Sequence, residues 1–282
     1  MKLDTRLTAG LLLLLASAPA AQAGVKIQTY DALASPGGST QLGAKFERGL
    51  MGWVWSPDLE KKQVEVGFGG QTFSGRTDDE GMIRFPITAP SQPGVYSFTA
   101  KYKKTSAVGK LYVTNKPLAI VDIDGTISDL PDWQVPFRGA KAKTFPGSPE
   151  LLRDLSRTHQ VVYLTARDDV WNSQTRAFLA RHNFPDGPVI YNELGQGNHG
   201  EFKLAKIREL RAMGLNPALG IGNAETDAYA YETAGIPSYI RTNKVVAGST
   251  SYRFLATDDL RRRLVQDGVL LVGLAGVIGS TP

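Results

Sequence analysis

Ala119-Ile-Val-Asp122-Ile-Asp124-Gly-Thr126-Ile127 is the stretch on which the fold prediction for this chain rests. Its apolar first half is typical of a buried strand, which ends in two carboxylates separated by one residue. Gly125 permits a tight turn that brings both carboxylates to the exposed carboxyl edge of a sheet. There one carboxylate can attack phosphorus while the other donates a proton to the leaving oxygen. An Asp-x-Asp pair after a strand can also be an ordinary turn, so the neighbouring segments have to decide.

Downstream of this stretch, apolar runs alternate with segments of helical period, which predicts an α/β domain with a parallel sheet flanked by helices. The domain begins after the polar linker Thr114-Asn-Lys-Pro117 and is expected to cover residues 116–282. In such sheets, ligands gather at the carboxyl ends of the strands. The predicted strands are 118–123, 161–165, 189–191, 218–221 and 238–240, and the predicted helices lie near 148–157, 170–182, 201–213 and 225–233.

Upstream, residues 24–115 show short stretches in which apolar and polar positions alternate, which is typical of strands. Turn signals such as Ser35-Pro-Gly-Gly38 and Pro90-Ser-Gln-Pro-Gly94 separate them. This spacing predicts a small antiparallel β-sandwich as a first domain.

Both ends of the chain carry apolar runs. The basic Met1–Arg6 segment, the run Leu11–Ala16 and Ala21-Gln22-Ala23 predict a signal peptide over residues 1–23, cleaved after Ala23, and hence export to a periplasm or beyond. An uncleaved anchor is the alternative, but the run is shorter than the roughly 20 residues that span a bilayer. The run 269–278 follows a basic cluster, so this tail either packs on its domain or rests on an anionic membrane.

Composition narrows the chemistry. The chain has no cysteine, which excludes disulfides, thiol catalysis and zinc held by cysteine. Its three scattered histidines argue against a metal site built from histidine. The formal net charge of +5 weakly favours anionic partners. The chain has no basic run with interleaved aromatic residues of the kind that indicates nucleic-acid binding.

Four segments, taken together, resemble the motifs of the haloacid dehalogenase superfamily. They are Asp122-Ile-Asp-Gly-Thr126, Val161-Val-Tyr-Leu-Thr-Ala-Arg167, Phe202-Lys203 and Gly220-Ile-Gly-Asn-Ala-Glu-Thr-Asp227. The resemblance implies an aspartyl-phosphate phosphatase with Asp122 as the nucleophile and Asp124 as the general acid and base. It also implies that Thr165 and Lys203 bind the transferring phosphoryl group.

The same resemblance implies a magnesium site, because nucleophile and phosphate are both anionic. Its ligands would be the Asp122 carboxylate, the Asp124 backbone carbonyl, Asn223 and, directly or through water, Asp227. Asn223 stands where an aspartate is common in the family, which leaves the site one charge lighter. Further candidates for substrate contact are Gly125, Thr126, Ala166, Arg138 and Arg167, the last of which could instead pair with Asp168 or Asp169.

Within the superfamily, the amino-acid sequences of these segments and of Ala234-Gly-Ile-Pro237 are similar to those of the lipin family of phosphatidate phosphatases. Lipins also carry an immunoglobulin-like unit, which residues 24–115 resemble. The intervals between the motifs leave no room for a large cap, and Trp133, Phe137, Arg138, Lys141 and Lys143 fall on the loop expected over the site. The resemblance implies phosphatidate or a related phospholipid as substrate, with peripheral membrane contact. The alternatives are a broad periplasmic phosphatase for soluble phosphomonoesters and a phosphatidate-binding module without turnover, although this chain keeps both carboxylates of the first motif.

Overall fold

The computed structural model describes residues 24–49, 57–130, 141–192, 197–244 and 248–271. The predicted signal peptide, the loop residues Trp133, Phe137 and Arg138, and most of the apolar run 269–278 lie outside the described residues. The described residues divide into two compact units, one made of residues 24–29, 43–85 and 97–109 and the other of 30–42, 86–96 and 110–271, each with the gaps just given. The expected domain boundary at residue 116 stays a prediction.

The N-terminal part of the described chain is built of strands in two sheets. The first sheet has the order β1-β3-β6 and the second the order β2-β8-β7-β4-β5. Their bounds are β1 (Gly24–Tyr30), β2 (Ala32–Ala34), β3 (Ser39–Gly49), β4 (Gln63–Phe68), β5 (Gln71–Arg76), β6 (Met82–Thr88), β7 (Gly94–Tyr102) and β8 (Thr105–Val113).

The second sheet is mixed, and in this respect the predicted antiparallel arrangement is wrong. β4 pairs antiparallel with β5 and β7, whereas the three-residue strand β2 pairs parallel with β8. The alternating pattern of β4 places Val64 and Val66 in the core. The ring centroids of Phe46 in β3 and Tyr102 in β7 lie 6.5 Å apart, so side chains of both sheets meet in this core. Period-two patterning thus located strands correctly but could not show the direction of their pairing.

The C-terminal part contains a six-stranded sheet in the order β11-β10-β9-β12-β13-β14, and every neighbouring pair in it is parallel. This confirms the predicted α/β sheet. Five strands match the predicted ones, while the short edge strand β14 was missed because three residues carry too little periodicity. The bounds are β9 (Leu118–Val121), β10 (Gln160–Leu164), β11 (Val189–Ile190), β12 (Pro217–Gly222), β13 (Ser238–Arg241) and β14 (Tyr252–Phe254).

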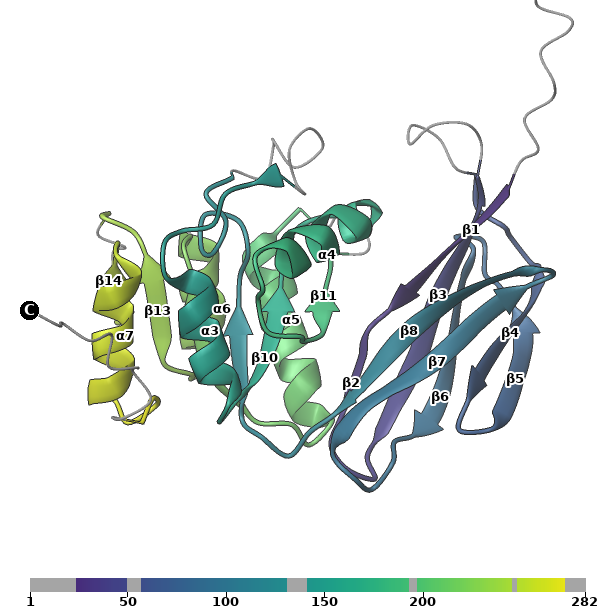
Figure 1. Ribbon diagram of the computed structural model, residues 1–282, viewed down its shortest axis with the longest axis horizontal. Coiled ribbons are helices and arrows are strands. Elements are labelled where there is room, and N and C mark those ends of the chain that lie inside the picture. The colour runs from purple at the N-terminus through teal and green to yellow at the C-terminus, as the bar shows by residue number, and fades with distance from the viewer. Residues whose placement is uncertain (1–23, 50–56, 131–140, 193–196, 245–247, 272–282) are drawn as a thin grey trace, which may run out of the picture. The chain divides into compact units, whose positions relative to one another are not determined.

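Helices cover both faces of this sheet, as Figure 1 shows. One face packs against helices α3 (Ser148–Ser156), α4 (Asn172–Arg181) and α7 (Thr257–Gln266), and the other against α5 (His199–Ala212) and α6 (Glu225–Thr233). Alternation along β9 divides the two cores, because Ala119 and Val121 face the first group while Leu118 and Ile120 face the second. Among the described residues, no helix combines the length and the apolar character needed to cross a membrane.

Two helix starts differ from the prediction for local reasons. The segment near 170 begins as a short 3-10 turn, η3 (Asp169–Trp171), with the Asp168 side chain accepting from the Val170 backbone N–H. Helix α5 starts at His199 because the Asn198 side chain accepts from the backbone N–H groups of Gly200 and Glu201. The earlier start of α5 places its first turn beside the carboxyl edge of the sheet.

Candidate active site

Asp122 and Asp124 lie at the carboxyl end of the central strand β9, between β10 and β12. β9 ends at Val121, and the Asp122 N–H still donates to the Ile221 carbonyl of β12 at 2.9 Å, which holds Asp122 at the edge of the sheet. Gly125 then turns with a φ of +73°. A Cβ at this position would also lie 2.0 Å from the Asn223 amide nitrogen, so only glycine fits the turn. The turn therefore brings the first and fourth motifs into contact.

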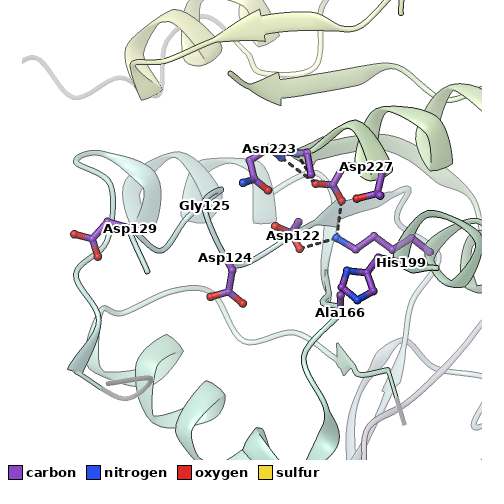
Figure 2. A pocket seen from close by; sticks show the side chains of 11 residues that line it. Asp122, Asp124, Gly125, Asp129, Ala166, His199, Asn223 and Asp227 are labelled. Carbon is purple, nitrogen blue, oxygen red and sulfur yellow. Dashed lines mark hydrogen bonds and ion pairs between the residues drawn. The ribbon is translucent and has the colours of Figure 1, made fainter. Parts of the chain in front are cut away.

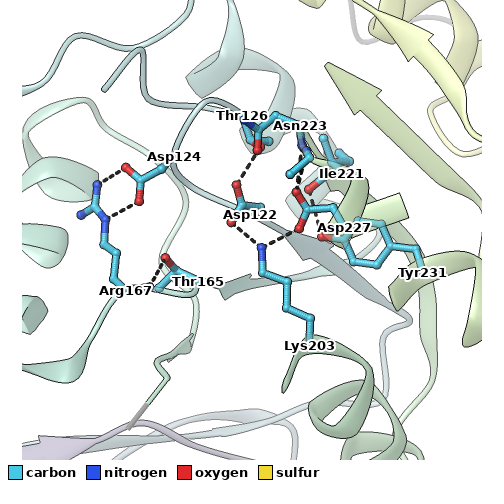
Figure 3. A network of polar contacts seen from close by, with 11 residues as sticks. Asp122, Asp124, Thr126, Thr165, Arg167, Lys203, Ile221, Asn223, Asp227 and Tyr231 are labelled. Atoms are coloured by element: carbon cyan, nitrogen blue, oxygen red, sulfur yellow. Dashed lines mark hydrogen bonds and ion pairs between the residues drawn. The ribbon is translucent and has the colours of Figure 1, made fainter. Parts of the chain in front are cut away.

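The Asp122 carboxylate is held from two sides. Thr126 Oγ1 donates to its Oδ2 at 2.8 Å, and Lys203 Nζ donates to its Oδ1 at 2.7 Å. The same ammonium reaches Asp227 Oδ1 at 2.5 Å, as Figure 3 shows. One buried lysine thus bridges two buried carboxylates, and the three predicted residues do meet.

Burial dominates the electrostatics of this cluster. It raises the pKa of Asp122 to about 7 against the opposing charge of Lys203, and the neighbouring Asp227 and Asp124 carboxylates add to the rise. For Lys203, burial lowers the pKa, but the Asp122 and Asp227 carboxylates outweigh it and the net direction is up. The lysine therefore stays charged and supports negative charge on Asp122.

Asp227 is fixed by the start of α6. Its Oδ2 accepts from the backbone N–H groups of Asn223 and Ala224, each at 3.0 Å, while its Oδ1 is taken by Lys203. Gly222 makes this possible, because a Cβ there would lie 2.5 Å from the Asp227 carboxyl carbon. With both oxygens engaged by the protein, Asp227 is better placed to orient its neighbours than to offer a free ligand.

Arg167 forms its ion pair with Asp124, whereas the sequence suggested Asp168 or Asp169 as its partner. Arg167 Nε donates to Asp124 Oδ2 and Nη2 to Oδ1, both at 2.6 Å, and Nη1 donates to Thr175 Oγ1 at 2.8 Å. Neither Asp168 nor Asp169 is the ion-pair partner. Thr165 lies behind this pair, nearly fully buried, and its hydroxyl accepts from the Arg167 backbone N–H at 3.2 Å.

A cleft of about 430 Å³ opens over these groups, as Figure 2 shows. Predicted site residues supply most of its lining, whereas Thr126, Thr165 and Arg167 lie outside the lining and Arg138 lies outside the described residues. The lining consists of Asp122, Asp124, Gly125, Asp129, Ala166, His199, Lys203, Asn223, Ala224, Thr226 and Asp227.

Sequence reasoning missed His199 and Asp129, which lie toward opposite ends of this cleft in Figure 2. Helical spacing could have found His199, because it precedes Lys203 by four residues on the same helix face. Asp129 had no such signal. A second cleft of about 470 Å³, lined in addition by Glu225, Thr242 and Lys244, shares Asn223, Ala224 and Thr226 with the first.

The donor set of the main cleft suits magnesium in kind. Among the described residues, no group of three or more His, Cys, Asp or Glu side chains is arranged to hold a metal ion. Mg²⁺ is nevertheless commonly bound through one or two carboxylates, with water and substrate oxygens completing its shell. The Asp122 carboxylate, the Asp124 carbonyl and the Asn223 amide oxygen provide hard oxygen donors, and Asp122 and Asn223 both line the cleft. The residues therefore fit the ion that the sequence predicted.

The part of the chain that contains this cleft is similar in sequence to known proteins. Residues 119–241 match the family model described as the LNS2 domain of PITM 1-3. Phosphatidic acid phosphohydrolase 1 of Saccharomyces cerevisiae is 30% identical over 175 residues, which cover 50% of this chain and 20% of the yeast protein. Human membrane-associated phosphatidylinositol transfer protein 3 is 25% identical over 180 residues, covering 58% and 18%. The chain thus spans about a fifth of the length of these relatives.

Among solved structures, D,D-heptose 1,7-bisphosphate phosphatase from B. bronchiseptica, complexed with magnesium and phosphate, gives a TM-score of 0.44 at 15% identity. The match covers 54% of this chain and 99% of that chain. A haloacid dehalogenase-like phosphatase from Mesorhizobium loti gives 0.42 at 15% identity and covers 65% and 98%. The sequence comparisons thus confirm the predicted resemblance to lipin-like proteins over residues 119–241.

Proposed function

We propose that this chain is a magnesium-dependent phosphomonoesterase that forms an aspartyl-phosphate at Asp122. One observation carries the proposal: a buried carboxylate at the end of the central strand lines the cleft and is held by Lys203 and Thr126. The lysine donates to one Asp122 oxygen and the threonine to the other, which fixes the plane of the carboxylate, and the second carboxylate, Asp124, lies two residues away. A nucleophile and an acid/base of this kind are what phosphoryl transfer to a side chain requires.

In the first step, an Asp122 oxygen attacks phosphorus, the bond from phosphorus to the leaving oxygen breaks, and Asp124 gives its proton to that oxygen. The products are an alcohol and the aspartyl-phosphate. In the second step, water attacks the phosphorus, its proton returns to Asp124, and phosphate leaves with Asp122 regenerated. Lys203 supports the phosphoryl oxygens, whereas Thr165, to which the resemblance gave the same role, lies outside the cleft lining. The Asp122 carboxylate, the Asp124 carbonyl, Asn223 and, through water, Asp227 would hold magnesium, which would supply charge neutralisation.

Phosphatidate or a related phospholipid is the substrate class that we favour. The yeast relative is named a phosphatidic acid phosphohydrolase, and the matched family model describes a domain of this lipin-like branch. The second cleft, continuous with the first at Asn223, offers room beyond the reacting phosphate. Soluble phosphomonoesters are the second substrate class. The charged residues Asp122, Asp124 and Lys203 that line the cleft could bind a phosphate group whether or not it belongs to a lipid.

A binding module without turnover is the alternative of a different class. It is favoured by the family model, which carries the name of phosphatidylinositol transfer proteins. The presence of both Asp122 and Asp124 in the cleft argues against it, because binding alone does not need a nucleophile and an acid.

We make three further proposals, which concern export, the N-terminal domain and contact with a membrane. Residues 1–23 would direct export to a periplasm or beyond before cleavage after Ala23. Residues 24–115 would form an immunoglobulin-like sandwich ahead of the catalytic domain at 116–282. Peripheral contact of the C-terminal apolar run with a membrane would bring the site to its substrate.

Phosphate release from phosphatidate vesicles and from a panel of soluble phosphomonoesters, measured side by side with and without EDTA, tests this function. We expect release that EDTA abolishes and that is faster from the vesicles. A preference for the soluble panel would refute the lipid substrate. Binding to phosphatidate vesicles without any release would favour the binding module.

A further inference from the structure

Arg167 and Asp124 form a buried two-point ion pair at the wall of the cleft. Both N–H···O distances are 2.6 Å, and the two side chains are only 1% and 5% exposed. A planar guanidinium that meets a carboxylate in this way fixes the plane of the carboxylate as well as its position. Among the described residues, no other side chain donates a hydrogen bond to Asp124. Within the described part of the chain, Arg167 is therefore the side chain that orients Asp124 through hydrogen bonds.

Arg167 is itself anchored from behind. Its third guanidinium nitrogen donates to Thr175 Oγ1 in α4 at 2.8 Å, and that hydroxyl donates onward to the Trp171 carbonyl at 3.0 Å. The Arg167 carbonyl accepts from the Asn192 backbone N–H at 3.1 Å, which ties the same residue to the segment after β11. Arg167 is thus held from behind by Thr175 and by the backbone of Asn192, independently of its contact with Asp124.

The direction of the Asp124 side chain determines how it can reach the leaving oxygen of a substrate. In Figure 3 the Asp124 carboxylate is turned toward Arg167, whereas the Asp122 carboxylate faces Lys203. In phosphoryl transfer, the leaving oxygen departs roughly in line with the attacking one. A proton donor to that oxygen must therefore turn one of its oxygens into the cleft. Both Asp124 oxygens accept from the guanidinium here, so a rotation of the carboxyl group that turns one oxygen into the cleft would exchange one of these two hydrogen bonds.

We propose that Arg167 is a positioning residue for Asp124, on which the carboxyl group pivots between a resting position with two hydrogen bonds and a working position with one. In the working position, one oxygen stays on the anchored guanidinium while the other faces the leaving oxygen of the phosphomonoester. The proposal rests on the proposed function. It assigns to Arg167 no contact with the substrate.

Leaving-group dependence separates this role from a structural one. The nitrophenolate of p-nitrophenyl phosphate leaves without help from a general acid, whereas the alkoxide of glycerol phosphate needs a proton. The ratio kcat/KM is the quantity to measure, because it reports only the steps up to departure of the leaving group. General acid catalysis contributes about 100-fold or more. In the full chain with magnesium, Arg167→Gln is therefore expected to lower kcat/KM about 100-fold for glycerol phosphate and less than about threefold for p-nitrophenyl phosphate.

Milder variants guard against loss of folding, which circular dichroism would report. Arg167→Lys keeps the charge but cannot form the two-point contact, so it is expected to fall between the wild type and Arg167→Gln. Thr175→Val removes the anchor of the guanidinium without changing any charge and is expected to lower kcat/KM a few-fold for glycerol phosphate alone. Arg261→Gln breaks the Arg261–Asp154 pair between α7 and α3, outside the cleft lining, and serves as the matched control.

A double-mutant cycle completes the test. If Arg167 acts through Asp124, then Arg167→Gln causes no further loss on glycerol phosphate in an Asp124→Asn background. Additive losses, or equal losses on the two esters, would overturn the positioning role while leaving the phosphatase function intact. A wild-type chain that releases phosphate from neither ester with magnesium would instead refute the proposed function, and the pair would then be a static ion pair.

Discussion

At the residue scale, Asp122 combines burial with two fixed donors. Replacing it by asparagine removes the proposed nucleophile but keeps the shape of the side chain, and Lys203 retains its second partner Asp227. We expect Asp122→Asn to lower magnesium-dependent phosphate release about 1,000-fold or more, since loss of a covalent nucleophile is not compensated. Asp259→Asn, on the exposed face of α7, is the control. Full activity of Asp122→Asn in a folded protein would contradict the nucleophile assignment.

Asn223 is the proposed magnesium ligand that carries no charge. Its amide lines the cleft beside Gly125, so Asn223→Asp adds a carboxylate there without a change of volume. We expect the variant to reach half-maximal activity at a several-fold lower magnesium concentration, because a further negative ligand strengthens attraction to the cation. It should also be less stable than the wild type in EDTA, where the new carboxylate is repelled by Asp122, Asp124 and Asp227. A magnesium titration with melting curves in EDTA measures both, and an unchanged magnesium requirement would argue that Asn223 is not a ligand.

At the scale of the elements, β12 and α6 approach so closely that glycine is required between them. A Cβ on Gly222 would lie 2.5 Å from the Asp227 carboxyl carbon, and one on Gly220 would lie 2.3 Å from the Tyr231 ring. We expect Gly222→Ala to lose activity because Asp227 is pushed off Lys203, and Gly220→Ala to lose mainly stability because a buried ring is displaced. Gly197→Ala, which meets no atom within 4 Å, is the control. Equal effects of all three substitutions on activity and on melting temperature would contradict this division.

The far end of α6 is tied to the segment that leads into β14. Ser249 Oγ and Ser251 Oγ each donate to Glu232 Oε1 at 2.6 Å. Burial raises the pKa of Glu232, but these hydrogen bonds outweigh it and the net shift is downward. A folded pKa below the unfolded one gives stability that is present above the unfolded pKa and is lost as the pH falls through the folded pKa.

We therefore expect Glu232→Gln to melt at a lower temperature than the wild type at pH 7. The difference should shrink as the pH is lowered toward 3, because the wild-type carboxyl then loses its charge. Thermal melts at several pH values measure this. A difference that stays constant across the range would show that charge on Glu232 does not stabilise the tie.

At the scale of the whole molecule, magnesium is expected to stabilise the fold by mass action. The proposed ligands come from the ends of β9 and β12 and meet only in the folded chain, so the ion binds the native state alone. A magnesium concentration about 100-fold above Kd would add about 2.7 kcal/mol to the free energy of unfolding. We expect a rise in melting temperature of several degrees that EDTA reverses and that Asp122→Asn weakens. An identical rise in Asp122→Asn would place the ion elsewhere.

Much of the site was determined by local sequence. Asp122, Lys203, Asn223 and Asp227 each stand beside a strand end or a helix start, and parallel strands bring such ends to one edge. The same reasoning gave the α/β sheet, because the alternation of apolar runs with helical period is a short-range pattern. It also required glycine at position 125, where the chain turns.

Only the tertiary structure decided which side chains pair across that edge. Arg167 reaches Asp124 over 43 residues of sequence, and Asn223 lies against Gly125 although 98 positions separate them. His199 enters the cleft because a cap at Asn198 begins α5 earlier than periodicity indicated. Periodicity encodes which face of an element is buried, but long-range pairing is selected by packing and by the cost of leaving a buried charge without a partner.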